Sequence, residues 1–269
     1  MADSTLDYSA ITARQQQTWA TGDFNVIARV VMAVSDALVE TANPRPGKRV
    51  LDVACGSGNC ALSASRRSAD VTGIDYVPAL IERAMARARA DGATVDFRVG
   101  DVQALPFPDA SFDTVMSVFG VMFAPDQEKT AGELWRVCKP GGTIALANWA
   151  PTGFGGDLFR MMGKYAPPPP GLKPGVRWGT EAGMKELFGA GTRIRLATRR
   201  FNQYCRSVDE MVDVYCNWFG PAARALAAQD GPGQAAMRHD LAAVFGKHNR
   251  ATDGVAEIDC EYAEVLITR

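Results

Sequence analysis

The segment that decides the fold reads Arg49-Val50-Leu51-Asp52-Val53-Ala54-Cys55-Gly56-Ser57-Gly58-Asn59-Cys60-Ala61. Its first half is a short apolar run, which is typical of a buried central strand in a parallel sheet. Gly56 and Gly58 then allow a tight turn and a close approach of a ligand to the backbone, because neither carries a Cβ. A helix is expected to begin at Asn59. A strand, a glycine turn and a helix in this order commonly hold a nucleotide-like cofactor.

Two classes of cofactor fit this turn. Gly56, Gly58 and Ala61 also match the G-x-G-x-x-G/A pattern of dinucleotide-binding proteins, and in either class Asp75 is placed as a ribose-binding carboxylate, about 20 residues further on. Asp52 separates the classes, because a carboxylate just before the turn would repel a pyrophosphate but tolerate a zwitterionic or cationic ligand. An NAD-dependent oxidoreductase is therefore the less favoured alternative.

Composition narrows the function further. The 269 residues include 29 Lys and Arg against 30 Asp and Glu, so no basic excess indicates a nucleic-acid partner. No apolar run reaches the roughly 18 to 20 residues of a membrane span, and the N-terminus shows no export signal. Six cysteines without a C-x-x-C pair predict a reduced, cytoplasmic setting.

Histidine is scarce, since His239 and His248 are the only two. A pair of this kind predicts no metal site. The candidates for a general base are His239, His248 and Tyr165. A structural role is the simpler explanation for each of them. The catalytic residue is therefore left unassigned.

Further along the chain, short strands alternate with helices, which implies a parallel sheet. After the first strand, the strands are expected at residues 70–75, 94–99, 112–118 and 143–148. Residues 24–38 have the apolar spacing of one amphipathic helix, within a helical arm or lid formed by residues 1–46.

The motifs of this region resemble, in order and spacing, those of class I S-adenosylmethionine-dependent methyltransferases. They are Leu51 to Gly58, Gly73 to Asp75, Gly100-Asp101, Leu105 to Phe107, Ser111 to Asp113, and Leu134 to Gly142. The similarity covers residues 47–150 and is greatest to the ubiquinone/menaquinone-biosynthesis-type group. It implies S-adenosylmethionine as cofactor and a doubly wound α/β fold. The expected sheet has seven strands in the order 3-2-1-4-5-7-6, with only the last antiparallel.

The resemblance also implies a set of cofactor contacts at the carboxyl ends of the strands. They are Asp52, Ala54, Gly56, Gly58, Asp75, Tyr76, Asp101, Val102 and Phe119. Asp75 is expected to accept both ribose hydroxyls, and Asp52 to attract the amino group or the cation. Tyr76 would pack on the adenine, with Asp101 and the Val102 N–H bonded to its edge.

Beyond residue 150 the family motifs end. Residues 151–180 are expected to be a loop or linker, and residues 193–204 and 257–268 alternate as the last two strands. The core is thus assigned to residues 47–206 and 255–269, and the helical insertion 207–254 to a cap. Met122, Phe123 and Trp218 are expected to line a closed, mostly apolar acceptor pocket beneath this cap.

The sequence thus predicts an enzyme that methylates a small, mostly apolar or aromatic metabolite, with no nucleic-acid or membrane partner. A non-catalytic S-adenosylmethionine-binding protein on the same fold is the alternative. The identity of the acceptor, its methylated atom and the oligomeric state, with a homodimer as one option, stay open.

Overall fold

A computed structural model describes residues 6–269, so the first five residues of the expected arm lie outside it. Seven strands form one sheet in the order β3-β2-β1-β4-β5-β7-β6, which confirms the predicted topology. β7 runs antiparallel to both of its neighbours. The strands are β1 (Arg49–Val53), β2 (Asp70–Asp75), β3 (Asp96–Val99), β4 (Phe112–Val118), β5 (Cys138–Asn148), β6 (Arg193–Cys205) and β7 (Ala256–Thr268).

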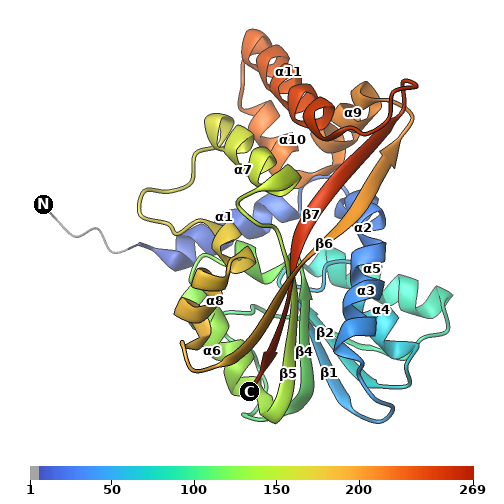
Figure 1. The fold of residues 1–269 in the computed structure, drawn as a ribbon, viewed down its shortest axis with the longest axis vertical. Coiled ribbons are helices and arrows are strands. Elements are labelled where there is room, and N and C mark those ends of the chain that lie inside the picture. The colour runs from blue at the N-terminus through green and yellow to red at the C-terminus, as the bar shows by residue number, and fades with distance from the viewer. Residues whose placement is uncertain (1–5) are drawn as a thin grey trace, which may run out of the picture.

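Helices cover both faces of the sheet (Figure 1). α3 (Met32–Ala42), α4 (Asn59–Ser65) and α5 (Pro78–Ala90) pack on one face. α6 (Gln127–Val137) and α8 (Glu181–Phe188) lie on the other. Within residues 6–269, no helix combines the length and apolar character that a bilayer span requires.

β1 is central because its side chains are buried from both faces. Val50, Leu51 and Val53 have no exposed surface, and the strand pairs in parallel with β2 and β4. Because the parallel neighbours end at one edge, the residues that follow β1, β2, β3 and β4 are brought together there.

The helix expected over residues 24–38 is two helices in the structure, α2 (Phe24–Val30) and α3. Val31 separates them with φ −107° and ψ 8°, outside the helical region. No glycine or proline marks the break, so the apolar spacing continues across it and gives no local sign of two elements.

The expected loop over residues 151–180 contains α7 (Gly153–Tyr165) and the short helix η2 (Gly175–Gly179). α7 buries Phe154, Leu158 and Met161 against its neighbours, and this tertiary packing outweighs the low helix propensity of its glycines. One of those glycines serves the packing, because a Cβ at Gly155 would lie 2.7 Å from the ring of Trp149.

The chain between β6 and β7 forms α9 (Val208–Trp218), α10 (Gly220–Ala227) and α11 (Gly231–His248). Together with α7 they make a helical layer beyond one end of the sheet (Figure 1).

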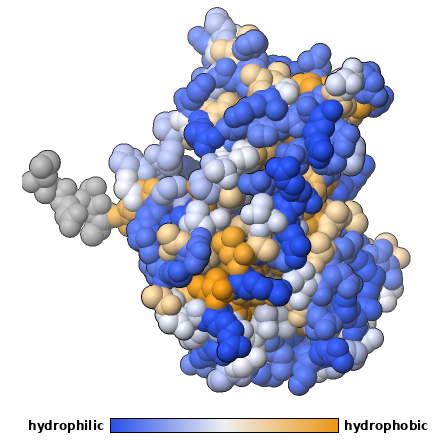
Figure 2. Space-filling view, viewed as in Figure 1, coloured by the Kyte–Doolittle hydropathy of each residue, from blue (hydrophilic) through white to orange (hydrophobic). Residues whose placement is uncertain are grey.

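In the face drawn in Figure 2 the surface is mostly hydrophilic. Apolar side chains gather there near α8 and the start of β6, where Phe188, Ile194 and Leu196 are only partly buried.

α10 approaches the N-terminal helix α1 (Tyr8–Trp19) through a glycine. A Cβ at Gly220 would lie 2.1 Å from the carbonyl oxygen of Thr18 and 3.0 Å from that of Thr21. Any side chain at Gly220 must therefore separate the two segments.

Gly220→Ala is accordingly expected to lower the free energy of unfolding by about 1–3 kcal/mol, the usual effect of overpacking. Urea denaturation followed by circular dichroism measures the change. Gly246→Ala in α11 is the matched control, because a Cβ there meets nothing within 4 Å. The control should be neutral or stabilising by up to about 1 kcal/mol. Equal effects of the two substitutions would mean that α1 and α10 do not meet in solution as described.

Candidate functional site

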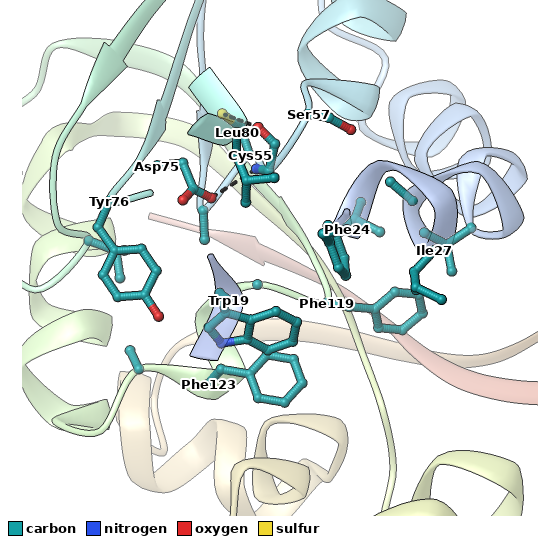
Figure 3. A pocket seen from close by; sticks show the side chains of 18 of the residues that line it. Trp19, Phe24, Ile27, Cys55, Ser57, Asp75, Tyr76, Leu80, Phe119 and Phe123 are labelled. Atoms are coloured by element: carbon teal, nitrogen blue, oxygen red, sulfur yellow. Dashed lines mark hydrogen bonds between the residues drawn. The ribbon is translucent and has the colours of Figure 1, made fainter. Parts of the chain in front are cut away.

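A cavity opens at the carboxyl edge of the sheet, between the strand ends and the surrounding helices (Figure 3). All but one of the predicted cofactor residues line it, and they come from four neighbouring strands. They are Asp52 in β1 with Ala54 and Gly56 after it, Asp75 at the end of β2 with Tyr76 after it, Asp101 and Val102 after β3, and Phe119 after β4.

Gly58 is the exception. It adopts φ 85° just before α4, and a Cβ on it would lie 2.8 Å from the ring of Phe97. The structure therefore assigns Gly58 to the close packing of the turn on β3 rather than to the cavity wall.

Sequence reasoning also missed Arg87 of α5, whose Nη1 donates to the Ser57 carbonyl and to Asn59 Oδ1, both at 2.7 Å, and so holds the turn in place.

The Asp75 carboxylate joins the glycine turn to β2. Its Oδ2 accepts the Gly56 N–H at 2.9 Å, and its Oδ1 accepts the Val77 N–H at 2.9 Å. Figure 3 shows this side chain above the cavity. Burial raises the pKa of Asp75 to about 6, although these hydrogen bonds act in the opposite direction. The carboxylate is thus ionised at neutral pH.

Asp52 lies deeper, with 1% of its surface exposed. Its Oδ2 accepts the Ala61 N–H at 2.8 Å, which ties β1 to α4. Burial raises the pKa of Asp52 to about 8. A cationic ligand beside it would favour the ionised form, because opposite charges attract strongly away from water.

Asp101 is held by Gln103, which the sequence analysis did not single out. The Gln103 N–H donates to Asp101 Oδ1 at 2.8 Å, and its side-chain amide donates to Asp101 Oδ2 at 3.0 Å. The same amide donates to Thr12 Oγ1 at 3.0 Å. Gln103 therefore connects the end of β3 to α1, and α1 crosses this edge of the sheet.

The other part of the cavity is walled by aromatic rings. They are Trp19 and Phe24 from the N-terminal helices, Phe119, Phe123 and Trp149 from the ends of β4 and β5, Phe159 from α7, and Tyr215 and Phe219 from α9 and its end. The Trp19 ring lies 4.9 Å from that of Phe123 and 5.7 Å from that of Phe219, centroid to centroid. Figure 3 shows Trp19 and Phe123 side by side. We call these eight rings the aromatic wall.

Phe119 shows backbone strain within this wall. It has φ 53°, a left-handed conformation that is rare for an aromatic residue. Its ring stacks on Trp149 at 4.2 Å with an interplanar angle of 10°. Ala54, which follows β1, has φ 49°. Strained residues of this kind cluster at ligand sites, where the surrounding structure holds them.

Two of the three predicted acceptor residues lie elsewhere. Met122 is 1% exposed, and its sulfur accepts the Trp149 N–H at 3.4 Å, so it belongs to the core. Trp218 is 41% exposed on the surface, whereas the next residue, Phe219, lines the cavity. The backbone leaves the helical conformation at Phe219 (φ −83°, ψ 101°), which turns consecutive side chains in different directions. Phe123 lines the cavity.

The candidate bases are not part of the cavity lining. His248 Nε2 lies 2.7 Å from Asp157 Oδ2, and the Tyr165 hydroxyl donates to Asp240 Oδ2 at 3.0 Å. His239 lies on α11 outside the lining. In the described part of the chain, no three His, Cys, Asp or Glu side chains are grouped so as to hold a metal ion.

The arrangement combines two chemical environments. Three carboxylates at the strand ends can accept hydrogen bonds from hydroxyl and amino groups and attract a cation. The adjoining aromatic wall can enclose a flat, apolar molecule. A reactive group held by the carboxylates would meet a second molecule held by the rings.

Comparisons with known proteins identify the domain. A family profile described as a methyltransferase domain matches residues 50–142. An uncharacterized protein of Mycobacterium tuberculosis is 40% identical over 225 residues, 81% of each chain. A demethylmenaquinone methyltransferase of Thermus thermophilus is 41% identical over 115 residues, 42% of this chain and 52% of that protein.

Among solved structures, the YcgJ protein of Bacillus subtilis has the same fold, with a TM-score of 0.59 and 22% identity over 88% of this chain and 99% of that one. The motifs, the sheet order and these similarities lead to one family. The chain belongs to the class I S-adenosylmethionine-dependent methyltransferases, enzymes whose cofactor is S-adenosylmethionine.

Proposed function

We propose that this enzyme methylates a small, mostly apolar or aromatic metabolite held by the aromatic wall. The observation that carries the proposal is that the wall and the three carboxylates line one cavity. The name of the Thermus relative, a demethylmenaquinone methyltransferase, fits an acceptor of this character. Turnover of labelled S-adenosylmethionine against a panel of apolar, aromatic and charged acceptors tests it.

On the cofactor side, Asp75 would accept the ribose hydroxyls and Asp52 would attract the amino group of the methionine tail. Asp101 and the Val102 N–H would bind the adenine edge, and Tyr76 would pack on its face. Ala54 and Gly56 would bring the backbone close to the methionine tail and the sugar. These roles follow from the positions of the residues along the strand ends.

On the acceptor side, the protein would act by positioning. S-adenosylmethionine supplies a methyl group already activated by its sulfonium, so in-line placement of the nucleophile provides much of the rate. The aromatic wall would orient a flat acceptor and exclude water. Residues 207–254 would act as a cap, through Tyr215 and Phe219, and residues 1–46 as a lid, through Trp19 and Phe24.

Asp75→Ala should weaken binding of S-adenosylmethionine by about 2–3 kcal/mol, the range for hydrogen bonds to a charged group. Titration calorimetry measures the change. Asp70→Ala is the matched control, because Asp70 is exposed at the opposite end of the same strand. An unchanged affinity in a folded Asp75→Ala protein would contradict the assignment.

Cofactor affinity should also depend on pH. Asp75, with a pKa of about 6, and Asp52, with a pKa of about 8, would both be ionised in the complex, so binding below these values releases protons. Affinity for the product S-adenosylhomocysteine should therefore rise with pH up to about 8, by up to about tenfold per unit between pH 6 and 8. Asp52→Asn should make the affinity nearly independent of pH between pH 6 and 8. If the affinity of the unaltered enzyme does not change with pH, then binding is not coupled to ionisation of these two carboxyl groups.

Phe219→Ala should lower kcat/KM for the acceptor by about 5- to 30-fold, because an aromatic contact of about 1–2 kcal/mol is lost. Cofactor affinity should change by less than about threefold, since the two parts of the cavity are separate surfaces. Trp218→Ala is the matched control and should retain kcat/KM, because this neighbour is exposed. The reverse pattern would place Trp218 at the acceptor.

A further inference from the structure

We propose that the methyl acceptor is an aromatic hydroxyl compound that reacts as its own anion, without a base from the protein. The inference rests on the proposed function and narrows its substrate class. It follows from which ionisable groups reach the cavity, how each of them is already bonded, and what the aromatic wall can hold.

The ionisable side chains that line the cavity, among residues 6–269, form a short set. They are Asp52, Cys55, Cys60, Asp75, Tyr76, Asp101 and Tyr215. Within that part of the chain, the lining contains no histidine, lysine or arginine. His248 and Tyr165, whose residue types could serve as bases, lie outside the cavity lining. They are hydrogen-bonded to Asp157 and Asp240, respectively.

The three carboxylates already accept hydrogen bonds from the protein. Asp75 accepts two backbone N–H groups, Asp101 accepts the backbone and side chain of Gln103, and Asp52 accepts the Ala61 N–H. All three follow or belong to β1, β2 and β3, whereas the aromatic wall comes from the ends of β4 and β5 and from the surrounding helices. The carboxylates serve the cofactor end of the cavity.

The remaining groups are poor bases. Tyr215 donates its hydroxyl to Gln203 Oε1 at 2.9 Å, in a buried position that raises its pKa. Burial also raises the pKa of Tyr76, and raises the pKa values of the Cys55 and Cys60 thiols well above the ordinary range. These groups are neutral at physiological pH and already hold their protons.

The acceptor must then be nucleophilic on its own. An aliphatic alcohol ionises too weakly, and a protonated aliphatic amine would find no free carboxylate within the aromatic wall. An aromatic hydroxyl ionises in water at a pH of about 10 or lower, as tyrosine does. Its flat ring can pack against the rings of the aromatic wall that line the cavity.

The chemical balance of the step is complete without the protein. The proton leaves to water before the acceptor reacts, and the aromatic anion forms a bond to the methyl carbon with its own electron pair. The carbon–sulfur bond breaks, and its pair stays on sulfur. The negative charge of the acceptor and the positive charge of the sulfonium cancel, so the apolar wall needs no counter-ion other than the cofactor.

The test is the pH dependence of kcat/KM for substituted phenols of similar size, with acceptor pKa values from about 7 to about 10. S-adenosylmethionine is kept saturating at every pH, so that the pH dependence of cofactor binding does not contribute. The rising limb is expected to follow the acceptor, with its midpoint moving by about one pH unit for each unit of acceptor pKa. His239→Gln should leave every midpoint in place. Tyr215→Phe should also leave every midpoint in place, because the Tyr215 hydroxyl takes no proton in the proposed reaction.

Each other outcome has a distinct meaning. A midpoint that stays fixed across the phenols, or that disappears in Tyr215→Phe, would identify a base in the protein and overturn this inference alone. Turnover of aromatic amines but of no phenol would replace the substrate class within the proposed function. Binding of cofactor with turnover of charged acceptors only would overturn the proposed function itself.

Discussion

The hydrogen bond from the Gly56 N–H to the Asp75 carboxylate links the glycine turn to the neighbouring strand. β1 and β2 lie side by side in the sheet, so the turn after one strand meets the acidic end of the other. Together with the hydrogen bond from the Val77 N–H, this bond favours the ionised form of Asp75 and opposes the desolvation that raises its pKa to about 6. The polar half of the cavity is built on this contact.

The apolar half depends on segments far apart in the chain. Trp19 from α1, Phe123 after β4 and Phe219 after α9 meet edge to face. Their contact requires α1 and α10 to approach closely, which Gly220 permits.

The cavity has a part lined by carboxylates and a part lined by aromatic rings, and this arrangement suits the proposed methyl transfer. In that reaction an anionic acceptor and a cationic sulfonium react to give neutral products. Carboxylates beside the sulfonium end attract a cation, and an apolar wall beside the acceptor strengthens the attraction between the two reactants. A wall of this type also selects by shape, since flat rings pack on it and solvated ions do not.

The parts of the fold and of the site that depend on neighbouring residues can be predicted from the sequence. The apolar run of β1, the glycine turn and the acidic strand ends at Asp75 and Asp101 are local patterns, so the buried position of β1 and the polar half of the cavity could be predicted from them. The strand order was predicted from the resemblance to a known family. Gln103 and Arg87 were missed, because a hydrogen bond between distant segments leaves no pattern in the chain.

Which apolar side chains face the cavity depends on tertiary packing and could not be predicted from local patterns. Phe123 and Met122 are adjacent and both apolar, as are Phe219 and Trp218, yet in each pair only the first lines the cavity. Which of two adjacent side chains faces the cavity depends on the direction of the backbone at the end of the helix or strand. That direction depends in turn on packing against segments distant in sequence. For the same reason α7 is a helix despite its glycines: its stability comes from the partners that it packs against.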